Sequence, residues 1–276
     1  MEQMMMSNEG QSDQDLRYLQ RVCSPHVAQR RLTAYIQGFV EEDQGHQAHI
    51  DLKLEHSLRV WEEARRIVGN EHISAQTGRL AEWAALYHDV GRFVQYRKYR
   101  TFKDGVSVNH AHLGFKTLRQ GSFLQGLSGR QARVVLQAVF MHNRAALPRH
   151  LPEPLGTVLS IVRDADKVDI IGVLSAHFFQ ENGDDQVLTL GLSNDPGRYS
   201  QHLLEQIRAD SFVDYRQMVW VNDFKLLLCS WVYALTFATA RNVLRNRGQI
   251  QQLLASLPQD GQIAALTADI ERVFLQ

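Results

Sequence analysis

Cysteine is scarce in this chain of 276 residues, which contains only Cys23 and Cys229. Two cysteines so far apart do not form the disulfide framework of a small secreted domain, and free thiols in a reducing cytoplasm are the simpler interpretation. A long hydrophobic run is also lacking. The most apolar stretch, residues 224–240, is about 17 residues long and contains Lys225, which is marginal for crossing a bilayer. We therefore expect a cytoplasmic protein without a membrane partner.

An excess of charge of one sign is missing as well, because 30 basic residues balance 30 acidic ones. A neutral chain has no general attraction for anionic polymers, so we do not expect it to read duplex nucleic acid. The N-terminal segment MEQMMMSNEGQSDQD is polar and lacks the basic and apolar regions of a secretory signal. Residues 1–15 are therefore predicted to be a disordered lead-in.

Alternating strand patterns are scarce, and helical periodicity dominates almost the whole sequence. Four of the six prolines lie between the periodic segments, as expected of residues that end helices, and Pro196 is predicted to open one. The predicted helices span residues 26–43, 50–68, 75–91, 108–120, 129–143, 155–177, 197–210, 212–243, 247–256 and 261–275. The sequence thus predicts an all-α fold.

The stretch from Asn182 to Gly197, rich in glycine and aspartate, is the best internal boundary. It divides the chain into a helical domain over residues 16–181 and a helical C-terminal extension over residues 182–276 that packs on it. The extension also contains aromatic side chains that fit either a buried core or the face of a homodimer, and the sequence leaves both open. These are Trp220, Trp231, Tyr233 and Phe237.

Histidine is abundant, with 12 copies, and several of them lie where their helix is otherwise apolar. His56, His88 and His142 do so in three predicted helices, and Asp166 does so in a fourth. A charged carboxylate on an apolar face is costly unless it is paired or binds a metal. One buried histidine is ordinarily a core residue, but several beside the adjacent pair His88-Asp89 favour a shared cation. Imidazole and carboxylate ligands suit Fe, Mn, Co, Ni or Zn, and the lack of thiolates argues against a structural zinc site.

The order of these residues resembles the HD superfamily of metal-dependent phosphohydrolases, which is named for its His-Asp doublet. The sequence reads LEHSLRV around His56, ALYHDVGR around His88 and Asp89, and VRDADKVDI around Asp166. The resemblance covers about residues 50–175 and implies an HD-domain helical bundle, to which the C-terminal extension is added.

Two further histidines are similar to those of the binuclear branch of this superfamily, which includes the HD-GYP phosphodiesterases. They are His110 in NHAHLGFKTL and His142 in AVFMHNR. The resemblance implies one or two divalent transition metal ions, with Asp89 bridging between them. The implied ligands are His56, His88, Asp89, Asp166, His110 and His142. Asp164 is a rival for the last aspartate and His112 a weaker rival for His110. The GYP triplet is missing, so cleavage of a cyclic dinucleotide does not follow.

The segment GRFVQYRKYRTFK, directly after the doublet, is rich in basic and aromatic residues. It fits a phosphate-binding loop with aromatic platforms for a base, or a solvated basic surface, and both interpretations stay open. Arg92 stands apart because the family often has a basic residue at that position. The predicted catalytic residues are His88, Asp89 and Arg92. The predicted substrate-binding residues are Arg92, Tyr96, Arg97 and Arg144, and Arg163 and Lys167 are weaker candidates of the same kind.

The function that this resemblance implies is hydrolysis of a phosphate ester of a small molecule. Metal binding lowers the pKa of water from 15.7 to about 7, which supplies metal-bound hydroxide as the nucleophile without a strong protein base. The arginines and tyrosines near the predicted ligands favour a nucleotide as the substrate. Two alternatives use the same residues: a mixed-valent di-iron oxygenase, and a non-enzymatic module that binds a metal or a nucleotide.

Overall fold

The computed structural model describes residues 24–179, 187–209, 213 and 215–275, so the predicted lead-in over residues 1–15 lies outside the described residues. Regular structure in the described part is helical, apart from a single bridge between Ser193 and Trp220. The predicted all-α class is confirmed. None of the described helices is both long enough and apolar enough to traverse a membrane.

The described helices are numbered in the order in which they follow one another along the chain. They are α2 (Pro25–Ile36), α3 (Gln44–Asn70), α4 (Ala75–Tyr87), α5 (Val90–Tyr99), α6 (His110–Gln120), α7 (Gly129–Met141), α8 (Leu155–Phe178), α9 (Gln201–Arg208), α10 (Val221–Ser230), α11 (Ala238–Arg247), α12 (Gln249–Ala255) and α13 (Gly261–Leu275). Four 3-10 turns lie between them: η1 (Gln37–Phe39), η2 (Asp104–Val106), η3 (Tyr215–Gln217) and η4 (Trp231–Ala234).

Local sequence accounts for many of the helix starts. Asp43, Ser74 and Asn109 precede α3, α4 and α6, and each side chain accepts a backbone N–H of the first turn. Such caps satisfy donors that have no partner inside the helix. Ser128 goes further and forms a capping box with Gln131 at the start of α7. The caps Ser74, Asn109 and Ser128 mark helix starts at or near the predicted ones, whereas α3 begins at Gln44, well before the predicted start at residue 50.

The structure differs from the predicted helices at several places. The predicted helix over 75–91 ends at Tyr87, and the basic segment, which was interpreted as a phosphate-binding loop or a solvated surface, forms α5, because its Phe93 and Tyr96 are buried in the core. The predicted helix over 212–243 is divided into η3, α10, η4 and α11. Helix α9 begins at Gln201 rather than near 197, and Pro196 lies in a turn. The predicted helix over 26–43 ends at Phe39, after α2 and η1.

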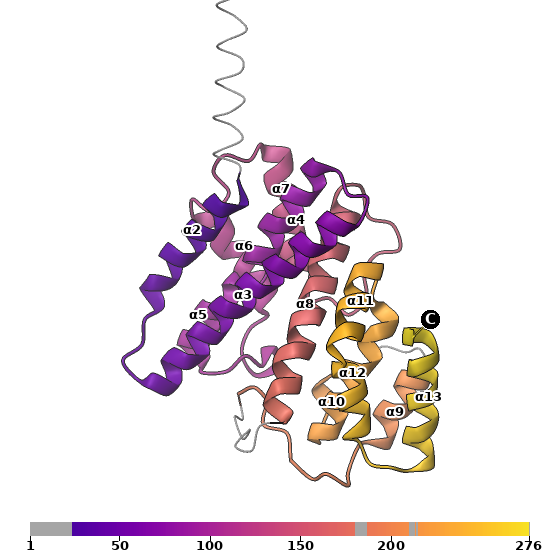
Figure 1. Ribbon diagram of the computed structural model, residues 1–276. Helices are drawn as coiled ribbons and strands as arrows, with labels where there is room; N and C mark the ends of the chain where they lie inside the picture. Colours follow the sequence, from indigo (N-terminus) through magenta and orange to yellow (C-terminus); the bar gives the residue numbers. More distant parts are fainter. Residues whose placement is uncertain (1–23, 180–186, 210–212, 214, 276) are drawn as a thin grey trace, which may run out of the picture.

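The central bundle is organised around α3, α4 and α8 (Figure 1). These three helices pack against one another, α7 packs on α4 and α8, and α5 packs on α6. Trp83, Tyr87 and Phe93 are among the largest fully buried side chains and fill the space between the helices. Helices α3, α5, α6 and α8 therefore surround one region from different sides.

The C-terminal helices continue this bundle on the other side of α8, where α11 and α12 lie against it (Figure 1). Helix α11 also contacts α3, and α10 packs on α12. Glu71, at the end of α3, accepts the backbone N–H and the hydroxyl of Thr239 at 2.9 and 2.8 Å. Glu63 of α3 forms an ion pair with Arg247. Buried apolar side chains from both parts form one cluster, and the predicted division of the chain near residue 182 stays a proposal.

Candidate metal centre

The break between α4 and α5 points two adjacent side chains toward the same place. Helix α4 ends at Tyr87, His88 caps it, and Asp89 has φ −101° and ψ 13° before α5 begins at Val90. Inside a continuous helix, neighbouring residues would diverge by about 100°. The predicted helix over 75–91 is therefore interrupted at this doublet, and Gly91 lies inside α5.

Gly91 allows α5 and α6 to approach each other closely. A Cβ atom at this position would lie 2.2 Å from the carbonyl oxygen of His110 and 2.5 Å from the backbone nitrogen of Gly114. Such distances are far below van der Waals contact, and the atoms involved belong to the backbone. Only glycine therefore allows His110, at the first position of α6, to lie beside Asp89.

The remaining side chains come from three other elements. His56 lies in the middle of α3, His142 caps the C-terminus of α7, and Asp166 lies in α8. All six predicted ligands converge on one region, although residues 56 and 166 are separated by more than a hundred positions in the sequence. The four histidines and Asp89 are buried.

The converging side chains form two groups that share Asp89. Its Oδ2 lies 3.5 Å from Nε2 of His56 and 3.8 Å from Nε2 of His88. Its Oδ1 lies 3.3 Å from Nε2 of His110 and 3.8 Å from Nε2 of His142. One carboxylate thus presents one oxygen to each pair of imidazoles. Both groups have the spacing of residues that hold a metal ion.

The hydrogen bonds on the far side of the rings fix which nitrogen faces the centre. Nδ1 of His88 lies 2.7 Å from the Ala85 carbonyl, and Nδ1 of His142 lies 2.8 Å from the Val139 carbonyl. Because a carbonyl oxygen only accepts, each Nδ1 carries a proton and donates it. When these rings are neutral, their Nε2 atoms offer lone pairs to the centre, which is the usual arrangement of histidine ligands.

Carboxylates orient the other two imidazoles. Nδ1 of His56 lies 2.7 Å from Asp169, which is also bound by Arg59 at 2.6 Å. Nδ1 of His110 lies 2.8 Å from Asp104. Carboxylate–histidine pairs of this kind commonly hold metal ligands in place and increase their basicity.

Within each pair the two imidazoles lie at hydrogen-bonding distance, with one Nε2 atom facing the other. The Nε2 atoms of His56 and His88 are 3.1 Å apart, and those of His110 and His142 are 3.0 Å apart. Two lone pairs at this distance repel unless a proton or a cation lies between them. Asp166 Oδ1 lies 3.2 Å from the His56 ring nitrogen, yet this buried oxygen forms no hydrogen bond with any residue that the structure describes. A buried carboxylate oxygen without a hydrogen bond, beside the imidazoles of His56 and His88, fits a bound divalent cation.

The pKa shifts give the same indication. Burial and Lys53 act to lower the pKa of His56, but Asp166, Asp169 and Asp89 outweigh them and raise it to about 10. Burial and the neighbouring His110 lower the pKa of His142 to about 3. The carboxylates around His56 therefore attract a positive charge, for which a proton and a metal ion compete. His142, in contrast, offers a neutral imidazole.

Positive side chains flank the shared carboxylate. Nζ of Lys53 is 2.9 Å from Asp89 Oδ2, and Nε of Arg92 is 3.5 Å from Asp89 Oδ1. Burial acts to raise the pKa of Asp89, but Lys53, His88 and Arg92 outweigh it and keep the pKa well below its usual value. Asp89 is therefore ionised, which is the form in which a carboxylate can bind a cation.

The structure brings only some of the predicted substrate-binding residues to this region. Arg92 lines the cavity described below and pairs with Asp104 at 2.9 Å. Tyr96 is buried outside the cavity, with its hydroxyl 3.0 Å from Nδ1 of His46. Arg97 is exposed and stacks over the ring of Phe39. Tyr96 and Arg97 therefore lie outside both cavities beside the predicted ligands, and their role in substrate binding stays a prediction.

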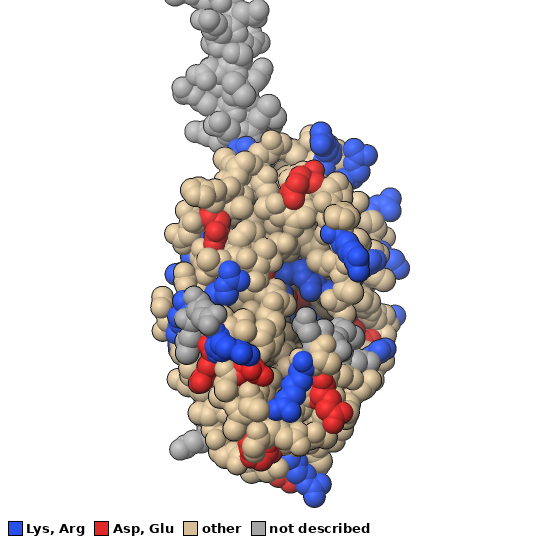
Figure 2. All heavy atoms as spheres, turned by 90° about the vertical axis from the view of Figure 1, so that its right-hand side faces the viewer, with Lys and Arg blue, Asp and Glu red and all other residues tan. Residues whose placement is uncertain are grey.

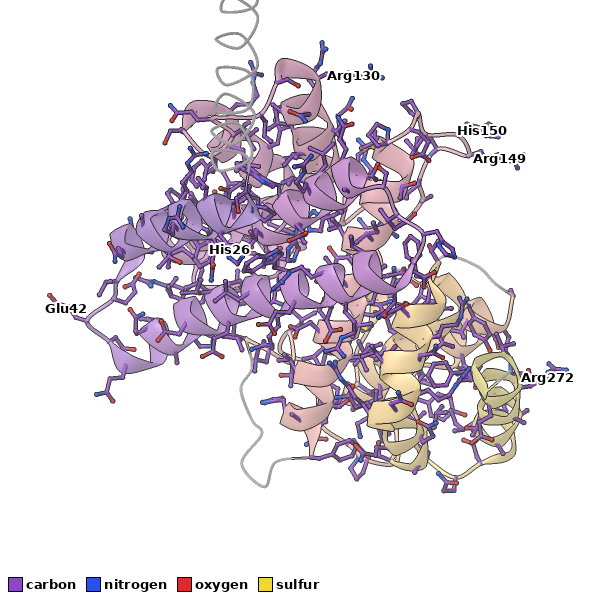
Figure 3. All side chains as sticks on the ribbon, turned by 45° about the horizontal axis from the view of Figure 1, so that its top comes forward. His26, Glu42, Arg130, Arg149, His150 and Arg272 are labelled. Carbon is purple, nitrogen blue, oxygen red and sulfur yellow. The ribbon has the colours of Figure 1, made fainter. Side chains whose placement is uncertain are left out.

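The two rivals considered for ligand positions lie elsewhere. Asp164 Oδ2 accepts the backbone N–H groups of Thr236 and Phe237, both at 2.8 Å, and so faces the C-terminal helices. The ring of His112 stacks on Phe140 with 4.5 Å between centroids. Other histidines also lie outside the centre: His26 packs on Trp61, and His150 extends outward from the connection between α7 and α8 (Figure 3).

Several residues at the centre were not predicted from the sequence. Asp169 follows Asp166 by three positions in α8, so helical spacing could have indicated it. Lys53 precedes His56 by three positions in the same way. Asp104 gave no such signal, because its place next to His110 depends on the path of the connection that contains η2.

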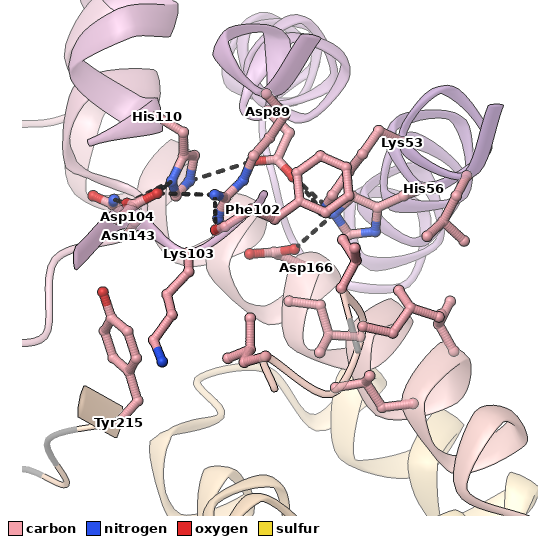
Figure 4. Close-up of a pocket in the computed structure, with 18 of the residues that line it drawn as sticks. Lys53, His56, Asp89, Phe102, Lys103, Asp104, His110, Asn143, Asp166 and Tyr215 are labelled. Atoms are coloured by element: carbon pink, nitrogen blue, oxygen red, sulfur yellow. Dashed lines mark hydrogen bonds and ion pairs between the residues drawn. The ribbon is translucent and has the colours of Figure 1, made fainter. Parts of the chain in front are cut away.

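A cavity of about 310 Å³ opens beside the six converging residues (Figure 4). Lys53, Arg92 and Lys103 line it near the histidines and carboxylates, and Asn143 lies there too. The rest of its wall comes from α8, α10, η3, η4 and residues 187–190.

A second cavity of about 360 Å³ lies on the other side of Asp166 and is lined by Arg144, Arg163 and Lys167. Burial and the neighbouring Arg163 lower the pKa of Lys167 to about 8. The face of the molecule that includes the C-terminal helices is hollowed, and basic side chains are visible inside the hollow (Figure 2). The centre is thus bordered by cationic groups on more than one side.

Comparison with known proteins gives one match. Residues 54–171 match the family model described as HD domain. The matched segment begins in α3 just before His56 and ends in α8 just after Asp169, so it contains all six converging side chains. No curated protein and no solved structure matches the chain.

Proposed function

Because residues 54–171 belong to the HD-domain superfamily, we propose that this protein is a metal-dependent phosphohydrolase that cleaves a phosphate ester of a small molecule. The observation that carries the proposal is the shared carboxylate of Asp89, which presents one oxygen to each of two imidazole pairs. A carboxylate between two cation positions is the arrangement that a two-metal phosphoryl-transfer site requires.

The residues present fit one or two divalent transition metal ions. His56, His88 and Asp166 would hold the first ion, and His110 and His142 would hold the second, with Asp89 shared between them. Four imidazoles and two carboxylates favour Fe, Mn, Co, Ni or Zn over Ca or Mg. When bound, such ions lower the pKa of water and neutralise phosphoryl oxygens.

The protein's own side chains would bind and orient the phosphate. Lys53 and Arg92 lie on two sides of Asp89 and supply positive charge where the phosphoryl group must enter. The buried Nε of Arg92 forms no hydrogen bond with any described residue, so it has a donor available for an oxygen of the ester. Lys103 also lines the cavity, where it lies between Asp104 and Tyr215 (Figure 4). Its ammonium group can stabilise the charge that develops on the leaving oxygen.

The nature of the alcohol part is a separate question. A nucleotide was favoured by the basic and aromatic residues after the doublet, but Tyr96 and Arg97 lie outside the cavity. Arg92 lines the first cavity and Arg144 lines the second, where a guanidinium group can bind the phosphate of a nucleotide or of any other ester. Nucleotides therefore belong in the set of esters to be tested.

The direct test measures metal content and activity together. The purified protein is loaded with Mn²⁺ and assayed with p-nitrophenyl phosphate, nucleoside monophosphates, cyclic nucleotides and dinucleoside polyphosphates. Asp89→Asn is expected to lose both bound metal and activity. The matched control is Asp269→Asn on α13, where the exposed carboxylate pairs only with Arg272 among the described residues, and it is expected to retain both.

Other outcomes distinguish the alternatives. If the protein with filled metal sites cleaves none of these esters, the proposal is refuted. Oxygen uptake with the spectroscopic signature of coupled iron would support the oxygenase that uses the same ligands. Nucleotide binding without turnover of any ester would support the non-enzymatic module.

A further inference from the structure

The wall of the cavity beside the metal centre is divided into two chemically different ends. Charged and polar side chains lie at the end next to Asp89 (Figure 4). The opposite end is built from side chains that are almost entirely hydrocarbon. We refer to it as the apolar end and define it by Ile170, Val173, Leu174, Phe224, Leu227 and Trp231.

Helix α8 connects the two ends directly. Ile170 and Val173 follow Asp166 by four and seven positions, so they lie on the same face of the helix as the predicted ligand. From Asp166 to Leu174 the helix rises by roughly 12 Å at about 1.5 Å per residue. A bound molecule that extends from the metal centre along α8 therefore passes from a charged to an apolar environment.

The C-terminal helices supply the facing wall. Phe224 and Leu227 project from α10, and Trp231 begins η4. The only nitrogen or oxygen atom in the side chains of the apolar end is the indole nitrogen of Trp231. A ribose with several hydroxyl groups, or a base with several polar edges, would leave buried donors and acceptors without partners there, which is costly.

We propose that the substrate is a phosphate ester of a compact aliphatic alcohol, with its phosphate at the metal centre and its hydrocarbon part in the apolar end. This inference rests on the proposed phosphohydrolase activity and specifies its substrate class. In the reaction the oxygen of water forms a bond to phosphorus while the bond between phosphorus and the ester oxygen breaks. The ester oxygen leaves as the alcohol after taking one proton, and inorganic phosphate remains.

The size of the cavity limits the length of the hydrocarbon part. A volume of about 310 Å³ is at the small end of the range for small-molecule sites. Each methylene transferred from water to an apolar site contributes about fourfold in binding. The preference is therefore expected to increase with chain length and then to level off or reverse once the cavity is filled.

The first experiment compares esters that differ only in the alcohol part. The Mn²⁺-loaded protein is assayed with straight-chain alkyl phosphates from methyl to octyl, with glycerol phosphate, nucleoside monophosphates and p-nitrophenyl phosphate. We expect kcat/KM to increase by about fourfold per added methylene over the first few members. We also expect glycerol phosphate and nucleotides to be poorer substrates than hexyl phosphate.

A binding measurement provides a readout that does not depend on turnover. Calorimetric titration of the Mn²⁺-loaded protein with hexylphosphonate is expected to give tighter binding than methylphosphonate and a more negative heat-capacity change, which indicates burial of apolar surface. Equal affinities for the two phosphonates would overturn the inference.

A variant at the half-buried Val173 tests the location. Val173→Phe fills part of the apolar end and is expected to lower the ratio of kcat/KM for hexyl phosphate over methyl phosphate by about tenfold or more. The matched control is Val273→Phe on α13, where the side chain is 45% exposed and lies outside the cavity, and the ratio should not change. If Val173→Phe does not fold, Ile170→Asn tests the same wall by adding a polar group instead of volume.

The outcomes separate the two proposals. Activity on p-nitrophenyl phosphate with no dependence on chain length, or with a preference for nucleotides, overturns the inference and leaves the phosphohydrolase proposal intact. No cleavage of any ester by protein with filled metal sites overturns the phosphohydrolase proposal, and the substrate class with it. An unchanged selectivity ratio in both α8 variants shows that the hydrocarbon part lies elsewhere.

Discussion

Replacing Gly91 with alanine tests whether the close contact between α5 and α6 assembles the metal centre. The added Cβ would lie 2.2 Å from the His110 carbonyl oxygen, whereas real Cβ contacts are rarely shorter than 3.0 Å. The two helices must therefore separate by roughly 1 Å, because backbone atoms cannot rotate out of the way. A shift of that size is comparable to the tolerance of a metal site.

The expected consequences differ between the two halves of the centre. His110 moves with α6 and away from Asp89 Oδ1, now 3.3 Å distant, so on the proposed two-ion site an ion bound by His110 and His142 should be lost first. His56, His88 and Asp166 belong to other elements, so an ion bound by them should be retained. The strain should also lower the free energy of unfolding by about 1–3 kcal/mol, which corresponds to roughly 2–10 °C in Tm for a chain of this size.

Elemental analysis of purified protein and thermal unfolding measured by circular dichroism give the two quantities. The matched control is Gly69→Ala near the C-terminus of α3, where an added Cβ meets no atom within 4 Å. Alanine there should be neutral or stabilising by up to about 1 kcal/mol. If Gly91→Ala binds as much metal as the wild type and unfolds at the same temperature, the role assigned to this contact is wrong.

Three further predictions concern the supports of the site and of the fold. Asp104→Asn should weaken metal binding at the position of His110 by about 10–100-fold, measured by metal titration, because the oriented carboxylate behind the ring is lost. Removing metal with a chelator should lower Tm, and adding free Mn²⁺ at about 100 times its Kd should restore about 2.7 kcal/mol of stability. An unchanged Tm would argue against a metal site in the folded protein. Hydrogen bonds from Thr239 hold the pKa of Glu71 below its usual value. The stability that the Glu71 carboxylate contributes is therefore present above about pH 4.5 and is lost as the pH falls through the lower pKa of the folded state. Glu71→Gln should therefore cost up to about 1 kcal/mol at pH 7 in denaturant unfolding, and the difference from wild type should shrink at pH 3.

Four of the positions that converge at the centre could be predicted because each lies where a predicted helix is otherwise apolar, whereas Asp89 and His110 were indicated by the resemblance to the HD superfamily. His56 and Asp166 illustrate this, since a polar residue on a buried face needs a partner, and the order of the residues supplied the rest. The amphipathic helices themselves, such as α6 and α13, were found by their spacing and by polar residues at their ends.

What could not be predicted depends on how distant segments meet. The pairing of His56 with Asp169 joins residues 113 positions apart, and no local pattern encodes it. Helix α5 was missed because its basic residues concealed the spacing of Phe93 and Tyr96, whose burial is decided by tertiary packing. The division between charged and apolar ends of the cavity is likewise invisible in the sequence, since its walls come from α3, α8, α10 and η4.

The position of Asp164 has a consequence for any attempt to isolate a minimal fragment. Its carboxylate is buried one helical half-turn before Asp166, and the two donors that satisfy its Oδ2 are backbone groups of residues 236 and 237. Truncation after the matched segment would remove both donors and expose to water the side of α8 that α11 and α12 cover. Asp166 lies two positions later in the same helix, so the loss of packing would reach the turn that presents it. A fragment that lacks the last helices is therefore expected to bind metal less well than the whole chain.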